Sequence, residues 1–224
     1  MSNAANLRTG ITLEYISVAW MVLEAVGSLV AGISASSTAL EAFGIDSVIE
    51  IVGGVTLIWR LRREVNGRST DDVRRAERVS SGIVGVGLLL LAGYIVIWSG
   101  SALLTRRAAE GSYLGIGVTL VSSALMPYLA LRKRRIGKAI GSKALEADGF
   151  CSMVCAYLSW MVLAGIVGTF LLGWWWIDAA AALGMVYFVV KEGLEAIESA
   201  RSSSGTGCAC RETSTTAAER PPET

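Results

Sequence analysis

Long apolar stretches dominate this chain, and they restrict its fold to a bundle of membrane-spanning helices. A helix needs about 20 predominantly apolar residues to cross the hydrocarbon core of a bilayer. Six such stretches occur, at about residues 11–33, 38–59, 80–104, 112–131, 144–172 and 174–198. The composition agrees, because 53% of the 224 residues are hydrophobic and the mean hydropathy is +0.53. We therefore predict an all-α membrane protein with six transmembrane helices.

The charged residues exclude several classes of function. Only 17% of the residues are charged, against about 25% in soluble domains. The 20 Lys and Arg nearly balance the 19 Asp and Glu, so nucleic acid is not an expected partner. The chain has no His, which excludes any mechanism that needs an imidazole base or ligand. Nothing in the sequence indicates an organic cofactor.

Positive charges gather in two of the breaks between the apolar stretches. Basic residues follow the second and fourth stretches, the breaks after the first and fifth have none, and the break after the third has Arg106 and Arg107. The two basic segments contain Arg60, Arg62, Arg63, Arg68, Arg74, Arg75 and Arg78, and then Arg132, Lys133, Arg134, Arg135, Lys138 and Lys143. Since Lys and Arg favour the cytoplasmic side, we expect both termini in the cytoplasm of a multi-pass protein of the inner (plasma) membrane. Binding of nucleic acid or lipid headgroups is the alternative for these segments.

Three segments are expected along the chain. Residues 1–10 form a short polar segment without the features of a cleavable signal peptide. Residues 11–198 form the six-helix domain, and residues 199–224, rich in Ser, Thr, Gly, Glu and Pro, form a disordered cytoplasmic tail. In this tail Cys208 and Cys210 are either ligands that capture metal ions or ordinary exposed thiols.

An internal repeat links the second and fifth apolar stretches. Residues 37–50 and 142–155 are identical at seven of 14 positions, with a constant offset of 105. The expected topology gives the two segments opposite orientations in the membrane. Inverted repeats of this kind place the binding site of many transporters near the bilayer midplane.

Each copy of the repeat carries two potential metal ligands one helical turn apart. They are Asp46 and Glu50 in the first copy, and Cys151 and Cys155 in the second. Residues four apart share a helical face, so two carboxylates and two thiols meet if these faces oppose each other, and four such ligands suit a tetrahedral divalent metal. The simpler interpretations are packing for the cysteines and hydrogen bonding for the carboxylates. A charged residue at bilayer depth costs about 2.5–3.5 kcal/mol, which favours a functional role.

The residues around these ligands resemble the cation diffusion facilitator (cation efflux) family, whose second and fifth spans carry the pattern S-x-A-L-x-A-D-x-x-H-x-x-x-D. The fifth stretch matches at Ser142, Ala144, Leu145, Ala147 and Asp148, and has Cys151 and Cys155 at the ligand positions. The second stretch matches at Ser37, Ala39, Leu40 and Ala42, and has Asp46 and Glu50 at the ligand positions. The segment from Trp175 to Asp178 is also similar to the start of the family's sixth span.

The resemblance implies a divalent-metal/proton antiporter with six spans. It covers about residues 11–198 and does not extend to the family's C-terminal cytoplasmic domain, which commonly supports dimerisation, so a homodimer is expected only weakly. Thiolates favour Zn²⁺ and Cd²⁺ over Mg²⁺, Ca²⁺ and Mn²⁺, while Co²⁺, Ni²⁺, Cu²⁺ and Hg²⁺ stay open. Because metal binding requires deprotonated ligands, we expect metal export in exchange for protons. The alternatives are a metal-binding scaffold that does not transport and a membrane thiol oxidoreductase.

Three further acidic residues lie in or beside the expected spans. Glu24 lines the path to the site, relays protons or bonds to a neighbouring helix. Asp148, three residues before Cys151, is expected near the cytoplasmic mouth, where it would attract incoming metal. Asp178 lies at the outer end of the sixth span and either eases metal release or caps a helix.

Overall fold

The computed structural model of the chain describes residues 3–65, 70–106 and 109–201 and is all-helical over these ranges. Its helices are α1 (Asn3–Ala35), α2 (Thr38–Val65), α3 (Thr70–Thr105), α4 (Tyr113–Ile140), α5 (Lys143–Leu172) and α6 (Ile177–Arg201). The prediction of an all-α fold with six helices is confirmed. Helix α1 begins at Asn3, so most of the predicted N-terminal segment is helical.

Five of the helices, α1 to α5, contain stretches long and apolar enough to cross a membrane. Helix α6 is 25 residues long and is not one of these five. Together the five apolar helices make the chain an integral, multi-pass membrane protein.

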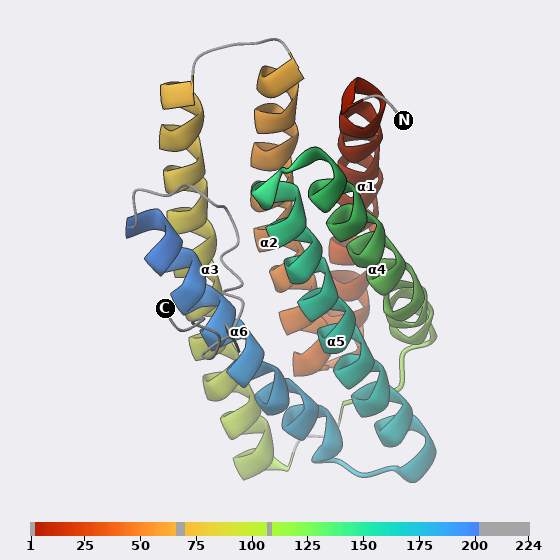
Figure 1. Ribbon diagram of the computed structural model, residues 1–224. Helices are drawn as coiled ribbons and strands as arrows, with labels where there is room; N and C mark the ends of the chain where they lie inside the picture. The colour runs from red at the N-terminus through yellow and green to blue at the C-terminus, as the bar shows by residue number, and fades with distance from the viewer. Residues whose placement is uncertain (1–2, 66–69, 107–108, 202–224) are drawn as a thin grey trace, which may run out of the picture.

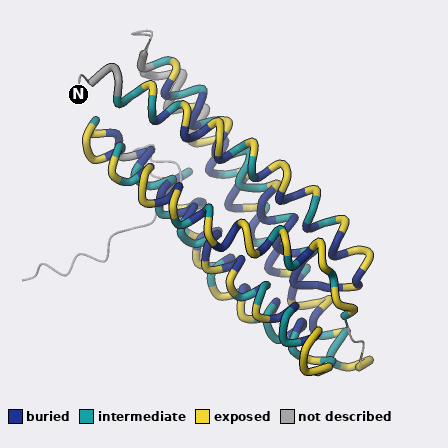
Figure 2. Tube along the Cα trace, turned by 90° about the vertical axis from the view of Figure 1, so that its right-hand side faces the viewer, coloured by how far each residue is buried: buried dark blue, intermediate teal, exposed yellow. Residues whose placement is uncertain are grey.

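Consecutive helices run in opposite directions in one elongated bundle (Figure 1). Helices α1, α3 and α5 begin at one end, which we call the terminal side because the N-terminus lies there; α2, α4 and α6 begin at the opposite, outer side. The most extensive contacts pair α4 with α5, α3 with α6, and α1 with α2, and α1 also packs on α4. Buried residues lie on the facing sides of the helices and exposed residues on the outside (Figure 2).

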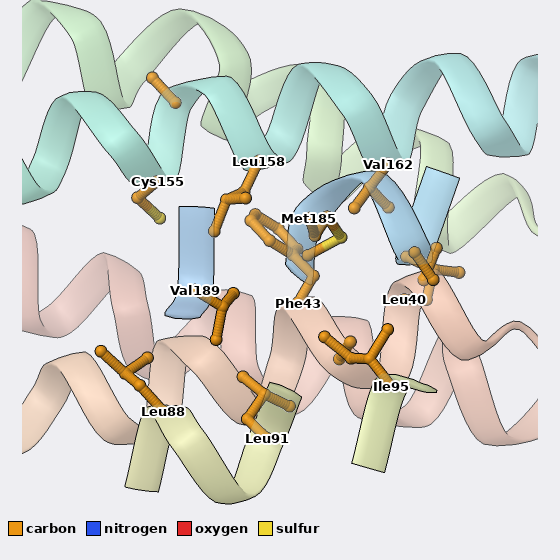
Figure 3. Packing of buried hydrophobic residues seen from close by; sticks show 14 of the residues in the cluster. Leu40, Phe43, Leu88, Leu91, Ile95, Cys155, Leu158, Val162, Met185 and Val189 are labelled. Carbon is orange, nitrogen blue, oxygen red and sulfur yellow. The ribbon is translucent and has the colours of Figure 1, made fainter. Parts of the chain in front are cut away.

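Apolar side chains from several helices fill the centre of the bundle. Phe43 of α2, Leu88 of α3, Leu158 of α5 and Met185 of α6 are each at most 2% exposed and belong to one cluster. Figure 3 shows these side chains pointing toward one another, with Cys155 of α5 beside them. The predicted ligand position at Cys155 therefore faces the interior and not the lipid.

The sequence repeat has a structural counterpart in two helical hairpins, α1–α2 and α4–α5. The hydroxyl of Ser37 accepts a hydrogen bond from Leu40 N at 3.2 Å, and that of Ser142 accepts one from Leu145 N at 3.5 Å. Such bonds satisfy backbone N–H groups that a helix N-terminus leaves without partners. Helices α2 and α5 thus begin in the same way but from opposite sides of the bundle, as the inverted repeat predicts.

The turns that precede these two helices also correspond at the offset of 105. Ser36 and Gly141 both adopt left-handed backbone conformations, with φ of 51° and 70°. Ser37 N donates to Gly32 O, and Ser142 N donates to Gly137 O. The repeat therefore extends back into α1 and α4, beyond the residues that reveal it in the sequence.

The second basic segment does not lie where the sequence predicts, because α4 extends beyond residue 131. The residues from Arg132 to Arg135 lie within α4, not in a connection between spans. Among them Lys133 is fully buried. Its ammonium group lies between carboxylates of α1 and α5, which supply the partners that a cation needs inside a helical bundle.

Candidate metal centre

Three of the four predicted ligands meet inside the bundle. Asp46 and Glu50 lie one turn apart on α2, and Cys155 lies on α5. One potential ligand atom from each of these side chains lies within 4.8 Å of the other two. Asp46 is 1% exposed and Cys155 is fully buried, so the group lies inside the protein. Antiparallel helices of two repeat copies bring the residues together, as the sequence predicts.

Three of the four carboxylate oxygens of this group lack a hydrogen-bond donor among the described residues. Both oxygens of Asp46 and Oε2 of Glu50 are buried without a hydrogen-bond partner. A buried carboxylate without a partner is costly, because it has given up its hydration and received nothing in exchange. A divalent cation at this point would supply the missing positive charge.

Cys151, the fourth predicted ligand, lies one turn before Cys155 on α5. It is 5% exposed and is not a member of the close group formed by Asp46, Glu50 and Cys155. Neither of the two cysteines takes part in a disulfide.

Glu24 of α1 lies beside the group and is held by neighbouring helices. Its carboxylate accepts hydrogen bonds from Trp20 Nε1 at 3.1 Å and from Ser47 Oγ of α2 at 2.6 Å, and also from Ser122 Oγ of α4. The Cys155 thiol donates to Glu24 Oε1 at 3.7 Å. Glu24 thus bonds to neighbouring helices, one of the three roles left open by its position in the first span.

Sequence reasoning missed the contribution of α6. Glu192 is buried at 8% exposure and lies close enough to Asp46 and Glu50 to act electrostatically on both. An acidic residue inside the sixth apolar stretch is the sequence feature that marks Glu192. The repeat, which indicates the other four candidate ligands, does not include α6.

Asp148 pairs with Lys133 of α4 instead of standing free near the membrane surface. Lys133 Nζ lies 2.5 Å from Asp148 Oδ2 and 3.1 Å from Glu14 Oε1 of α1. It also donates to Ser152 Oγ at 3.3 Å. Attraction of incoming metal by Asp148 is thus opposed by an ammonium group already in contact with it.

Asp178 of α6 caps the N-terminus of α2. Ser37 Oγ donates to Asp178 Oδ1 at 2.6 Å, and Ala39 N donates to Oδ2 at 3.4 Å. The two roles predicted from the sequence were metal release and helix capping, and these contacts are those of a helix cap. Asp178 also lines a cavity of about 280 Å³ at the outer side, together with Glu41 and Trp98 among others. Cys208 and Cys210 lie outside the described residues.

Comparison with known proteins identifies the same family as the site motif. Residues 15–203 match the cation efflux transmembrane domain. The chain is 26% identical over 170 residues to the uncharacterized transporter sll1263 of Synechocystis. The aligned region covers 75% of this chain and 55% of that protein. It is also 26% identical over 151 residues to transmembrane protein 163 of Xenopus laevis, covering 67% of this chain and 52% of that protein.

A third relative is the uncharacterized transporter YdbO of Bacillus subtilis, which is 27% identical over 207 residues. That match covers 91% of this chain and 71% of YdbO. The chain spans about half the length of the first two relatives. Since the family match covers most of the chain and agrees with the helical bundle and the motif, this protein belongs to the cation efflux transmembrane domain family.

Proposed function

We propose that this protein exports a divalent transition-metal cation across the membrane in exchange for protons, with Zn²⁺ or Cd²⁺ as the preferred substrate. The proposed binding site consists of Asp46, Glu50, Cys151 and Cys155. The observation that supports it most directly is the close group of Asp46, Glu50 and Cys155, whose ligand atoms lie within 4.8 Å of one another inside the bundle. The proposal places the protein in the inner membrane of the cell, with both termini in the cytoplasm.

The ligand atoms of the group can hold a small metal ion if the distances between them shorten. Zinc binds sulfur at about 2.3 Å and carboxylate oxygen at about 2.0–2.2 Å, so tetrahedral ligand atoms lie about 3.3–3.8 Å apart. In the proposed site, side-chain rotation brings the ligand atoms of Asp46, Glu50 and Cys155, which now lie within 4.8 Å of one another, to such separations. In the proposed site Cys151 approaches from the preceding turn of α5 as the fourth ligand.

The donor set supports the choice of metal. A thiolate is a soft ligand and a carboxylate is a hard one, and a mixed set favours Zn²⁺ and Cd²⁺ over Mg²⁺ and Ca²⁺. The partnerless oxygens of Asp46 and Glu50 add negative charge, which attracts a doubly charged ion into the interior of the bundle.

Proton exchange follows from the same ligands. A thiol must lose its proton to bind metal, and so must a protonated carboxyl group, so metal binding releases protons. Return of protons to Cys155 or to the carboxylates from the outer side would then displace the metal. In this scheme the ligands themselves carry the protons, which is consistent with a chain that has no His.

Metal uptake into everted vesicles tests the transport proposal. Vesicles with the intact protein should accumulate Zn²⁺ or Cd²⁺, and Asp46→Ala should abolish the uptake. Glu146→Gln is the matched control, because it removes a carboxylate that pairs with the exposed Lys138 at 3.5 Å. Metal binding without uptake by the intact protein would favour the scaffold alternative. Equal uptake by intact and Asp46→Ala protein would contradict the proposed site.

An imposed pH gradient tests the exchange. In proteoliposomes that contain the purified protein, a gradient that drives protons opposite to the metal should accelerate metal flux, and the reversed gradient should slow it. Cys151→Ser should reduce both the flux and its dependence on the gradient. A metal flux that changes neither with the pH gradient nor with Cys151→Ser would rule out the proposed coupling.

A further inference from the structure

A buried ion-pair network separates the candidate metal centre from the terminal side of the bundle. Lys133 of α4 is fully buried, and its ammonium group contacts Glu14 of α1 at 3.1 Å and Asp148 of α5 at 2.5 Å. It donates a hydrogen bond to Ser152 of α5 at 3.3 Å. Glu14 is also fully buried, and the side chain of Asp148 is 13% exposed. One lysine thus holds α1 against the α4–α5 hairpin.

The network adjoins the metal centre along α5 and lies further toward the terminal side along α1. Ser152 precedes Cys155 by three residues on α5, which is less than one turn. Glu14 precedes Glu24 by ten residues on α1, or about 15 Å toward the terminal side. A cation that approaches the centre from the terminal side along α1 and α5 therefore meets the network first.

Stability is a weak explanation for these charges. Burial of an ion pair costs desolvation that the attraction between the charges often only offsets. The network also has two carboxylates for one ammonium, so the pairing leaves an excess of negative charge. Ionisable groups inside membrane helices commonly belong to the transport path, because apolar residues pack the same space at lower cost.

The repeat shows that the network is confined to one side of the bundle. At the offset of 105, Glu14, Lys133 and Asp148 correspond to Thr119, Ser28 and Phe43. These three are fully buried, and none of them is charged. Uncharged side chains thus occupy the equivalent places toward the outer side, where the cavity of about 280 Å³ lies beside Glu41 and Asp178.

We propose that Lys133 is the latch of an inner gate. Its ion pairs with Glu14 and Asp148 hold α1, α4 and α5 together toward the terminal side. These pairs must separate before a cation reaches Asp46, Glu50 and Cys155 from the terminal side. The proposal rests on the transport function proposed above. Lys133 acts here as a positioning residue, because among the described residues its ammonium group contacts Glu14, Asp148 and Ser152 and not the proposed metal ligands.

Hydrogen exchange of the purified, metal-free protein tests the latch. Lys133→Met removes the charge and keeps the length of the side chain. It should accelerate amide exchange about tenfold on the terminal side, in peptides from residues 6–14 and 133–152, as the open form gains population. Because opening of one side accompanies closure of the other, exchange near the outer cavity, in residues 98–106 and 174–180, should slow. Lys138→Met is the control, since within the described part of the chain this exposed lysine of α4 pairs with Glu146 at the surface.

The reciprocal change separates a latch from a structural contact. Faster exchange on the terminal side without slower exchange at the outer cavity would show that Lys133 only stabilises the fold, and unchanged exchange would also overturn the proposal. If Lys133→Met does not fold, Glu14→Gln retains the Lys133–Asp148 pair and should give a smaller shift of the same sign. Asp46→Ala should leave the latch intact, so failure of metal transport and failure of the latch are distinguishable.

Discussion

Cys155 and Cys151 are chemically identical, but the structure gives them different positions relative to the carboxylates. Cys155 belongs to the close group with Asp46 and Glu50, while Cys151 lies one turn away on α5. We therefore expect Cys155→Ser to weaken Cd²⁺ and Zn²⁺ binding more than Cys151→Ser does. Loss of a soft ligand should also narrow the preference for Cd²⁺ over Mn²⁺. Calorimetric titration of both variants with the three ions measures this order, and a larger effect of Cys151→Ser would reverse the assignment.

Asp46 illustrates the conflict between stability and function at a single residue. Both of its carboxylate oxygens are buried without a hydrogen-bond partner, close to Glu50 and Glu192. Asp46→Asn should raise the melting temperature of the metal-free protein, because a neutral amide costs less to bury than an uncompensated charge.

The same substitution should remove stabilisation by metal. At a metal concentration 100 times the Kd, the intact protein should gain about 2.7 kcal/mol. Asp46→Asn should gain little, whereas Asp178→Asn should respond as the intact protein does, because Asp178 caps α2 and is not a proposed ligand. Thermal melts with and without Zn²⁺ measure both effects. An unchanged response to metal in Asp46→Asn would exclude Asp46 as a ligand.

At the level of elements, the two hairpins depend on close approach of their helices near the turn. A Cβ atom on Gly137 would lie 2.8 Å from Glu146 N, and one on Gly32 would lie 2.7 Å from Glu41 N. Each contact involves backbone, which cannot move aside as a flexible side chain does. The pairs Gly32–Glu41 and Gly137–Glu146 correspond at the repeat offset of 105, so both hairpins close in the same way.

Alanine substitutions test this element directly. Gly137→Ala should destabilise the protein by about 1–3 kcal/mol, because the added methyl group overpacks the hairpin. Gly93→Ala in α3 has nothing within 4 Å of the added atom, and it should stabilise the helix by up to about 1 kcal/mol. Thermal melts of the two variants should therefore shift in opposite directions. A melting temperature of Gly137→Ala that is unchanged or raised would show that the close approach in the hairpin is not needed.

For the whole molecule, six membrane crossings would place both ends of the described chain on the same side of the membrane. Helix α6 is the element to test, because it is not among the five helices that qualify as spans by length and composition. It packs along α3 over an extensive interface. We expect α6 to cross the membrane beside α3, with its polar residues, such as Glu192, directed into the bundle.

Protease protection checks this topology. Short tags before Asn3 and after Arg201 should both be cleaved in everted vesicles and both be protected in right-side-out vesicles. A tag inserted in the α3–α4 connection, on the outer side, should show the opposite pattern. Cleavage of the two terminal tags from different sides would mean that α6 does not cross the membrane.

Local patterns were sufficient to predict the helices and most of the candidate site. Apolar stretches of about 20 residues predict helices that a bilayer accommodates, whatever their partners are. The four-residue spacing places Asp46 with Glu50 on one face, because helical periodicity is a property of a single segment. The repeat then indicated that α5 brings Cys155 to the same point, since related segments of opposite orientation meet at the centre of the bundle.

Packing between helices decided the rest, because the rotation of each helix about its axis depends on neighbours distant in the chain. Spacing treats Cys151 and Cys155 alike, yet only Cys155 joins the close group. A basic stretch reads as a surface segment, but the burial of Lys133 depends on carboxylates 119 and 15 residues away, in α1 and α5. The sequence alone thus predicted which side chains are candidate ligands, because spacing within one helix is a local property. Only the tertiary structure decided which of them meet and which charged residues lie buried nearby, because both depend on contacts between distant helices.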